Sequence, residues 1–484
     1  MLYEASIVLL AGVVILAYGV EFIFNQFDDP REPRRITPKV PVPVIGHILG
    51  VFRYGFNYYS LLSKNTDAEI YALGILNFKV YITQTTRLTH LVQKSKALSF
   101  TPFLKVPSTV VSKDAHALFD GSLLESFSLR TKEALTPGPH LDMQNLRMAH
   151  QLLIHVTEMV QQSEVDLFHW AKHAIVQATA AGLIWEERRP GQMLGLDLFY
   201  KGYRARAKVF DAFRKYFKHI PDDVSYLILQ RQKLLREGGI PEEDTYKMQA
   251  TLSNAAYPNT VPTLFWTVHE IYSRPELLEV IRQELLDKAV GKSDDGTGFV
   301  LDIAALQTEC HILLSAYQET QRTRHSQVAW RMVTEDTLLD QYLLKKGNYL
   351  QMPVRPVHES QSIWGSQANV FDPYRFVPAK NGETKPKVMP STFLPWGSPP
   401  HLCPARQFAS TEILIAAALL ILRVQLTPVS GRGWERAPPV KSGTPTLPRP
   451  KQDIRLKITT RDEGKQSWTV MIGKSKSRIS LASG

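Results

Sequence analysis

Apolar residues recur along this chain with two periods, one typical of helices and one typical of strands. Helical spacing dominates from Leu123 to Leu286 and returns at Leu306–Arg322 and at Pro404–Leu422. Strand character over Ile70–Thr83 indicates two strands that meet around Asn77. The pattern therefore predicts a mainly α fold with small β-sheets, in the α+β class.

The N-terminal half also contains shorter segments. Phe52–Ser63 and Arg87–Ser95 have helical spacing, and Pro190-Gly191 marks a loop. Phe100–Phe119 has few periodic signals, so we expect it to be a loop over a cavity.

Strand-like alternation returns in the C-terminal third. Trp330–Val354 alternates and contains Gly347-Asn348, a dipeptide typical of hairpin turns. Asp453–Thr460 and Ser467–Ile472 alternate too, with a turn at Asp462–Gly464 between them. These segments predict small sheets, the last of them a hairpin.

The N-terminus carries a long apolar segment. Ala5–Phe24 is twenty residues long and apolar except for Ser6 and Glu21, which is enough to span a bilayer. Basic residues follow from Arg31 onward, so the positive-inside rule places the rest of the chain in the cytosol. A cleaved signal peptide is the alternative, but a basic n-region and a cleavage site are missing. We expect a transmembrane anchor over residues 1–25, a Pro- and Arg-rich linker over 26–47 and one domain over 48–484.

Charge and cysteine content narrow the class of protein. The net charge is +11 with a pI near 9.4, but the basic residues are scattered and no nucleic-acid motif is present. Anionic lipid or an acidic protein partner suits this charge better. From Lys474 onward the tail is basic and serine-rich, and is expected to fray. Two cysteines, Cys310 and Cys403, argue against a disulfide framework.

Cys403 has the most informative surroundings. The segment Thr392–Ala409 reads TFLPWGSPPHLCPARQFA, a Pro- and Gly-rich loop followed by a helix. Pro404 suits the first helical turn, so the cysteine lies at a helix N-terminus, where amides and the dipole stabilise a thiolate. Such a thiolate suits an axial ligand of iron. A buried structural cysteine explains these local residues equally well.

This loop resembles the cysteine loop of the cytochrome P450 family. Trp396, Gly397, His401 and Cys403 match the aromatic, glycine, basic and cysteine positions, whereas Pro399 and Ala405 replace two glycines. The resemblance implies a P450 fold whose domain over 48–484 binds haem b. It makes Cys403 the axial ligand of the iron, places the basic His401 at a haem propionate and puts Trp396 and Gly397 in the haem-binding loop.

Two further motifs of the family follow in order. Glu319 and Arg322 match the Glu-x-x-Arg pair, and Arg375 matches the arginine that closes its network. Arg331 fits the place of a strand arginine that contacts a propionate. The resemblance makes the first three residues a structural network and Arg331 a cofactor-binding residue.

The motif over the distal haem face is altered. Ala255–Thr260 stands where the family has an acid and a threonine that deliver protons. Pro258 replaces the acid and Asn259 the threonine, with Thr260 next. We assign these three residues to the catalytic site. The variant resembles the branch that holds sterol 7α-hydroxylases and prostacyclin synthases.

Three functions are weighed on this basis. The first is a membrane-anchored haem-thiolate monooxygenase that inserts oxygen from O2 into a sterol- or terpenoid-like substrate in secondary-metabolite biosynthesis. The second, motivated by Pro258 and Asn259, is a haem-thiolate isomerase or dehydratase that needs no external electrons. The third is a haem-binding sensor. Apolar residues are expected around the substrate cavity: Phe103, Val106, Leu252 and Tyr257.

The resemblance also implies partners and a location. NADPH-cytochrome P450 reductase is the expected electron donor, with cytochrome b5 as a second donor. The other partners are membrane lipid and an apolar small molecule, with no nucleic acid. The expected location is the endoplasmic reticulum membrane, crossed once, with the catalytic domain in the cytosol.

Overall fold

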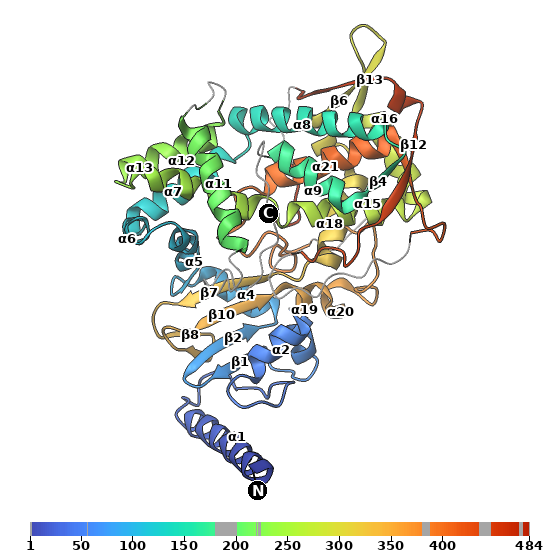
Figure 1. The fold of residues 1–484 in the computed structure, drawn as a ribbon. Coiled ribbons are helices and arrows are strands. Elements are labelled where there is room, and N and C mark those ends of the chain that lie inside the picture. The colour runs from blue at the N-terminus through green and yellow to red at the C-terminus, as the bar shows by residue number, and fades with distance from the viewer. Residues whose placement is uncertain are drawn as a thin grey trace.

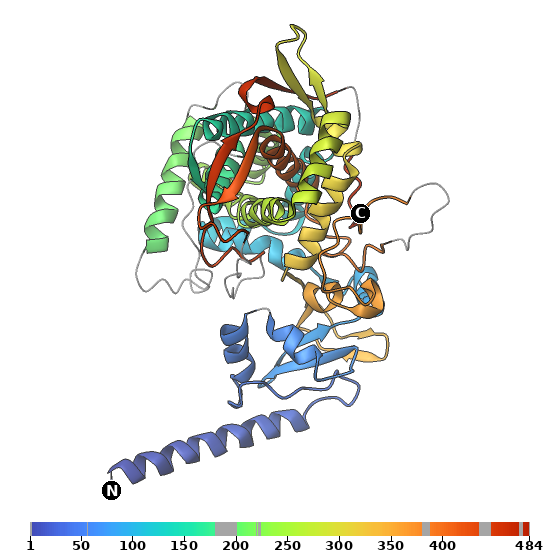
Figure 2. The same ribbon diagram turned by 90° about the vertical axis from the view of Figure 1, so that its right-hand side faces the viewer.

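The computed structural model describes residues 2–55, 57–179, 201–218, 220, 224–379, 388–434, 447–473 and 478–483. Within these ranges a helical body stands on a β-sheet, and the N-terminal helix projects from the far side of that sheet (Figure 1). The side view shows this helix crossing beneath the sheet (Figure 2). This mainly α architecture with small sheets agrees with the predicted α+β class. The loop predicted at Pro190-Gly191 lies outside the described residues.

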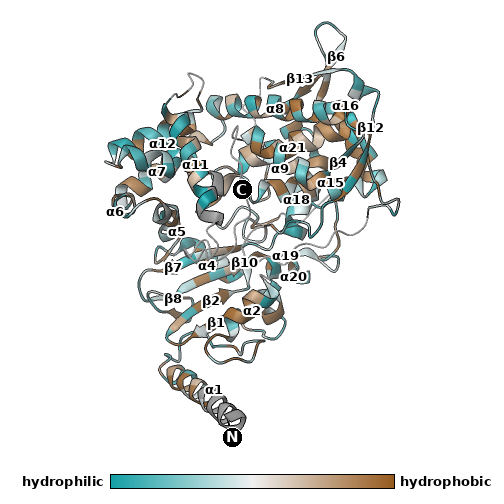
Figure 3. Ribbon diagram, in the orientation of Figure 1, coloured by the Kyte–Doolittle hydropathy of each residue, from teal (hydrophilic) through white to brown (hydrophobic). Residues whose placement is uncertain are grey.

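Helix α1 (Leu2–Gln26) contains the long apolar segment. Its described residues are coloured mostly as hydrophobic (Figure 3). A search of the described residues finds no helix that is both long and apolar enough to cross a membrane. Two further helices follow, α2 (Gly46–Tyr54) and α3 (Asn57–Ser63). The single helix predicted over Phe52–Ser63 is therefore wrong in extent, because Gly55 (φ 60°) ends α2.

The main sheet has five strands in the order β1-β2-β10-β7-β3. The predicted turn around Asn77 is confirmed, since β1 (Ile70–Ile75) and β2 (Phe78–Thr83) pair antiparallel. The other members are β3 (Leu98–Ser99), β7 (Val328–Val333) and β10 (Tyr349–Pro353). Helix α4 (Thr86–Lys94) confirms the helix predicted at Arg87–Ser95.

The hairpin predicted at Gly347-Asn348 is wrong. Gly347 does adopt a left-handed conformation (φ 82°), but β10 pairs with β7 and β2 rather than with the strand just before the turn. That preceding strand, β9 (Tyr342–Leu344), pairs with β8 (Thr337–Leu339). The dipeptide thus marks a turn, while the pairing is decided by long-range contacts.

The Pro-rich linker is attached to this sheet. Arg35 forms a bridge with Ala72 of β1, and its guanidinium donates to Asp28 Oδ2 at 2.6 Å and to the Leu76 carbonyl at 3.0 Å. Lys79 of β2 lies 2.6 Å from Asp28 and 2.5 Å from Glu32. The linker therefore contributes an edge to the sheet and does not act as a free spacer.

Phe100–Phe119 is not a loop. It forms α5 (Thr101–Lys105), a 3₁₀ turn (Val106–Val110) and α6 (Lys113–Leu118). Each of these is at most two turns long, too short for an apolar period to show in the sequence. Ser112 caps α6 by accepting from the Ala115 N–H.

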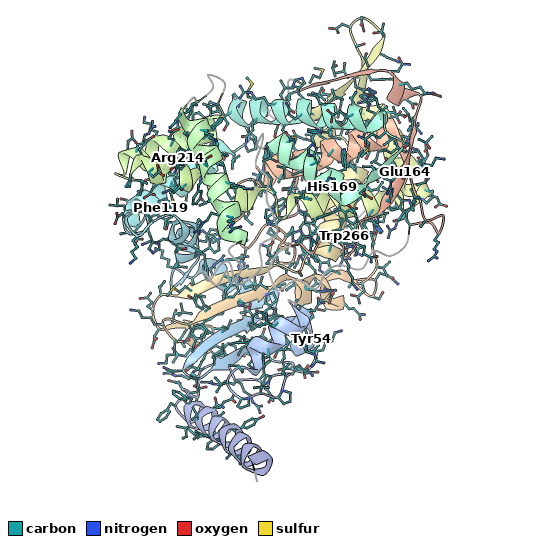
Figure 4. All side chains as sticks on the ribbon, viewed as in Figure 1. Tyr54, Phe119, Glu164, His169, Arg214 and Trp266 are labelled. Atoms are coloured by element: carbon teal, nitrogen blue, oxygen red, sulfur yellow. The ribbon has the colours of Figure 1, made fainter. Side chains whose placement is uncertain are left out.

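The helical body is built around α21 (Arg406–Arg423), in which every residue from Gln407 to Arg423 is buried. Helix α15 (Thr260–Tyr272) is equally buried, and its Trp266 donates to the Pro448 carbonyl at 2.7 Å (Figure 4). The helices around these two are α7 (Gly121–Ala134), α8 (Pro139–Val160), α9 (Leu167–Thr179), α11 (Lys201–Lys218), α12 (Tyr226–Glu237), α13 (Glu242–Ala250), α14 (Ser253–Ala256), α16 (Pro275–Lys288), α17 (Ile303–Thr308) and α18 (His311–Arg324). The helix predicted over Leu306–Arg322 is in fact α17 and α18.

Two small sheets close the body. One contains β11 (Val424–Pro428), β12 (Arg455–Thr460) and β4 (Glu164–Asp166), and the other β13 (Ser467–Met471), β6 (Gly298–Asp302) and β5 (Val290–Lys292). The final hairpin predicted from β12 and β13 is therefore wrong, because these strands belong to different sheets. The remaining elements are α19 (Val354–His358), α20 (Gln361–Trp364) and a 3₁₀ turn (Glu463–Lys465).

The end of the chain packs against the body. The Ile479 backbone exchanges two hydrogen bonds with the Gln407 amide, at 2.9 and 3.1 Å. The Ala482 N–H donates to Gln318 Oε1 at 2.7 Å. The expected fraying is therefore wrong for residues 478–483.

Candidate functional site

A tight loop positions Cys403. The Cys403 N–H donates to the Trp396 carbonyl at 2.8 Å, and the His401 N–H donates to the Ser398 carbonyl at 3.2 Å. Gly397 makes the turn with a φ of 89°, and a Cβ there would lie 3.2 Å from the His401 carbonyl oxygen. Only glycine suits this position without strain.

Cys403 is half-buried and directly precedes the buried helix α21. Burial raises the pKa of its thiol, although the Ala405 backbone N–H donates a hydrogen bond to it and thereby favours the thiolate. The Ala405 amide at the helix start therefore acts on the sulfur as the sequence predicts, and burial opposes it. Helix α21 begins at Arg406, two residues later than predicted. A metal ion at the sulfur would reverse this balance, because a coordinated thiol is deprotonated.

Positively charged side chains lie beside the loop. Arg331 is 2% exposed, and the hydrogen bonds found for it among the described residues run to the backbone carbonyls of Trp330 at 2.7 Å, Ser398 at 2.9 Å and Pro399 at 3.4 Å. Burial lowers the pKa of Arg331 to about 10. A buried arginine normally has an anionic partner. The geometry therefore fits an external anion at this place.

His401 adds to the same positive region. Burial, followed by the charges of Arg331 and Lys132, lowers the pKa of His401. Its ring lies 5.6 Å from the ring of Phe100. Lys132 of α7 was not singled out from the sequence, where nothing distinguishes it from other exposed lysines. Its proximity to His401 arises only in the fold.

Aromatic side chains line the approach to this region. The Phe100 and Phe103 rings stack at 5.6 Å, and Phe103 also contacts Trp330 at 6.0 Å. The indole Nε1 of Trp396 is buried without a hydrogen-bond partner in the described part of the chain. A flat, largely apolar group that carries anionic substituents and an atom for the sulfur to ligate fits this donor set. Haem has those properties.

A buried network supports the loop from the other side. Arg322 donates to both carboxylate oxygens of Glu319 at 2.7 Å, and Arg375 reaches the same carboxylate at 3.2 Å. The Arg322 guanidinium also donates to the His358 and Ala368 carbonyls. The structure thus brings together the three residues that the resemblance assigned to a network.

His358 connects this network to the cysteine loop. One ring nitrogen of His358 lies 3.1 Å from the Arg322 carbonyl oxygen, and the other lies 3.2 Å from the Leu394 N–H donor. The Leu394 carbonyl in turn accepts from the Gly397 N–H at 3.2 Å. The Glu319–Arg322 pair is therefore joined to the turn that precedes Cys403 by a continuous chain of hydrogen bonds.

The altered distal motif lies at a break between two helices. Helix α14 ends at Ala256 and α15 begins at Thr260. Pro258 and Asn259 are exposed, whereas Thr260 is buried and its hydroxyl donates to the Ala256 carbonyl at 2.9 Å. Within the described ranges, no hydrogen bond joins these residues to the Cys403 loop or to the Glu319 network.

The expected substrate-cavity residues are dispersed. Val106 is 42% exposed, whereas Tyr257 is 4% exposed and belongs to the core around α15 and α21. Two cavities in the described residues lie elsewhere. One of about 370 Å³ is lined by Glu164 and His169 (Figure 4), and one of about 540 Å³ lies between the linker and β2.

Comparisons with known proteins find one family. The cytochrome P450 family model matches residues 197–455. The cytochrome P450 monooxygenase nodJ of Hypoxylon pulicicidum is 30% identical, over 99% of both chains. A cytochrome P450 monooxygenase of Gibberella zeae is 25% identical, over 92% of this chain and 90% of its own. The human 7-alpha-hydroxycholest-4-en-3-one 12-alpha-hydroxylase is 28% identical, over 46% of this chain and 47% of its own.

Proposed function

The chain belongs to the cytochrome P450 family and is a P450 monooxygenase, and from this premise we propose that it inserts oxygen from O2 into an apolar, sterol- or terpenoid-like substrate. The cofactor that the family implies is haem, and we propose haem b. The observation that carries the proposal is the buried Arg331, which has no carboxylate partner among the described residues and lies next to the loop that presents Cys403.

Each residue of the site has a proposed task. Bound haem supplies an iron centre that activates O2 with electrons from a redox partner. Cys403 ligates the iron, and the Ala405 N–H stabilises negative charge on its sulfur. Arg331 and His401 bind the propionates. The Glu319–Arg322 pair fixes the loop through His358, so the sulfur keeps one position.

The substrate class rests on resemblance. The altered motif at Pro258 and Asn259 is similar to that of a sterol-oxidising branch, and a human steroid 12-alpha-hydroxylase is among the relatives. Two relatives that match over nearly the whole chain come from fungi. We therefore assign the chain to secondary-metabolite biosynthesis.

Membrane attachment is proposed for the N-terminal segment. Ile15, Leu16 and Phe22 of α1 are 64–72% exposed, an arrangement that suits lipid better than water. We propose that residues 1–25 anchor the chain in the endoplasmic reticulum membrane. The linker over 26–47 and the catalytic domain over 48–484 would then lie in the cytosol. Phospholipid vesicles should bind the full chain and not a variant without residues 1–27.

The activity is tested with the full chain, haem, NADPH-cytochrome P450 reductase, NADPH and O2, against a panel of sterols and terpenoids. Cytochrome b5 is added as a second electron donor. NADPH and O2 should be consumed together with formation of a hydroxylated product. Product formed from an oxygenated substrate without NADPH would instead identify an isomerase or dehydratase, the function that Pro258 and Asn259 favour.

A further inference from the structure

Three hydrogen-bond donors meet at Ser398, in the turn that precedes Cys403. Ser398 is 0% exposed. Its carbonyl oxygen accepts from the Arg331 guanidinium of β7 at 2.9 Å and from the His401 N–H at 3.2 Å. Its hydroxyl oxygen accepts from the side-chain amide of Gln93 in α4 at 3.1 Å. This one residue therefore joins the cysteine loop to a strand of the main sheet and to a separate helix.

The composition of the loop explains why acceptors attach it. Pro399 and Pro400 have no backbone N–H, so neighbouring elements can hold these two residues only by packing or through their carbonyl oxygens. The N–H groups of His401 and Cys403 bond inside the loop. The hydroxyl of Ser398 gives the loop a further acceptor that a side chain outside it can reach.

Helix α4 holds Gln93 in a fixed position. Thr85 caps the helix by accepting from the Leu88 N–H. Leu88 and Val92 lie one turn apart, are 0% and 1% exposed, and pack into the core beside the main sheet. Gln93 follows Val92 directly and is half-buried. Its amide therefore reaches the loop from a helix that is itself anchored by packing.

Two supports hold the loop at different residues. The Glu319 network reaches Leu394 through His358, from the helical body. The amide of Gln93 reaches Ser398 from the side of the main sheet. A ligand keeps one position only when the residues around it are held by their own partners. Support at both residues therefore limits the movement of the turn, and of the cysteine that follows it.

We propose that Gln93 is a positioning residue for the iron ligand, holding Cys403 in place through the hydroxyl of Ser398. This inference rests on the proposed function, in which the Cys403 sulfur ligates haem iron. Among the described residues no hydrogen bond joins Gln93 to Cys403, so Gln93 acts through Ser398. Without its amide the loop opens more often, by about 2- to 12-fold, the factor that one neutral hydrogen bond contributes.

The first test follows hydrogen exchange of the His401 and Cys403 amides in the full chain. Gln93→Met keeps the length of the side chain and removes the donor, whereas Ser398→Ala removes the acceptor. Each variant should accelerate exchange about 2- to 12-fold. The double variant should show no larger effect than either single variant, because both remove one bond. Exchange at the wild-type rate in both single variants, or additive effects in the double variant, would overturn the proposal.

The second test follows the sulfur ligand in the haem-loaded full chain. The dithionite-reduced, CO-bound form is placed in mild urea, and the loss of the Soret band of the thiolate-ligated haem is timed. Gln93→Met and Ser398→Ala should each lose this band about 2- to 12-fold faster than wild type. An unchanged rate in both variants would exclude a positioning role.

Gln84→Met is the matched control for this measurement. Gln84 is half-buried just before α4, and its side-chain amide donates to the Ala68 carbonyl at 2.5 Å. The substitution removes the same kind of donor without touching the cysteine loop, so the thiolate band should be lost at the wild-type rate. An acceleration equal to that of Gln93→Met would show a general loss of stability and overturn the proposal.

The outcomes separate the two claims. A folded, haem-loaded wild type without the thiolate band would contradict the haem-thiolate site on which the inference rests. A wild type with the band, whose loss is not accelerated in Gln93→Met or Ser398→Ala, would contradict only the positioning role. If Gln93→Met did not fold, Ser398→Ala would decide the question alone, because it removes the same hydrogen bond by a smaller change.

Discussion

Glu319 and Arg322 form a two-point ion pair in which both N–O distances are 2.7 Å and neither side chain is more than 1% exposed. Arg375 adds a third contact to the same carboxylate. Because the pair is joined to the cysteine loop through His358, its integrity should decide both stability and haem binding.

Glu319→Gln should therefore destabilise the protein strongly. The substitution leaves the Arg322 guanidinium buried without a counter-charge, which costs about 3–5 kcal/mol. Urea unfolding of the haem-free chain measures this loss. The control is Glu133→Gln, which breaks an exposed pair with Arg130 and should change stability by less than about 0.5 kcal/mol. Equal effects of the two substitutions would contradict a buried network.

Arg331→Met should weaken haem binding. Hydrogen bonds to a charged group are worth about 1.5–3 kcal/mol, so the affinity should fall by roughly 10- to 150-fold. Haem transfer to apomyoglobin measures the loss. Arg423→Met is the matched control, because Arg423 is also buried and the hydrogen bonds found for it run to Thr157 and the Gly464 carbonyl. An unchanged transfer rate in Arg331→Met would exclude the proposed propionate contact.

Glu412 should make stability fall as pH rises. Its folded pKa of about 8 exceeds the ordinary value of about 4.3. Between these values the folded chain binds a proton that the unfolded chain does not, so stability decreases through this window. Glu412→Gln lacks this proton and should gain stability relative to wild type from pH 5 to 8, by at most about 5 kcal/mol.

Urea unfolding at several pH values measures this difference. The exposed Glu309→Gln serves as control and should follow the wild-type curve. If the free energies of unfolding of wild type and Glu412→Gln changed with pH in parallel, the carboxyl group would be charged in the folded protein at neutral pH.

Lys79→Met should release the linker from the sheet. Lys79 is buried between Asp28 and Glu32, and its removal leaves Glu32 without a cation among the ion pairs found. Trypsin should then cleave faster after Arg31, Arg34 and Arg35, by a factor of ten or more for each 1.4 kcal/mol of lost docking energy. Cleavage as slow as in wild type would mean that the bridge between Arg35 and Ala72 holds the linker alone.

The sequence predicts the elements better than their pairing. The antiparallel strands around Asn77 are local and were found, whereas β10 joins β7 and β2 through contacts that no short segment reveals. The predicted pairing of β12 with β13 is wrong for the same reason, because each strand pairs with a partner far away in the sequence. Helix α21 is continuous and apolar, and its start was predicted to within two residues.

Some residues of the candidate site could be predicted from the sequence, and others are revealed only by the fold. The Glu319, Arg322 and Arg375 positions came from motif resemblance, and the structure supplies their contacts. Lys132 has no local signal, because only the fold brings it near His401. Glu412 does have a local signal, because it is the single acid in α21 and directly precedes the apolar run that begins at Ile413. The burial that opposes ionisation of the Cys403 thiol has no local signal either, because burial cannot be read from a helix start.

The central claim is that Cys403 ligates haem iron through its sulfur. Its most direct test is the absorption spectrum of the dithionite-reduced, CO-bound full chain, recorded for wild type and Cys403→Ala. Wild type should show the red-shifted Soret band of a thiolate-ligated haem, and the variant should lose it. A folded, haem-loaded wild type without this band, or a variant that retains it, would contradict the assignment.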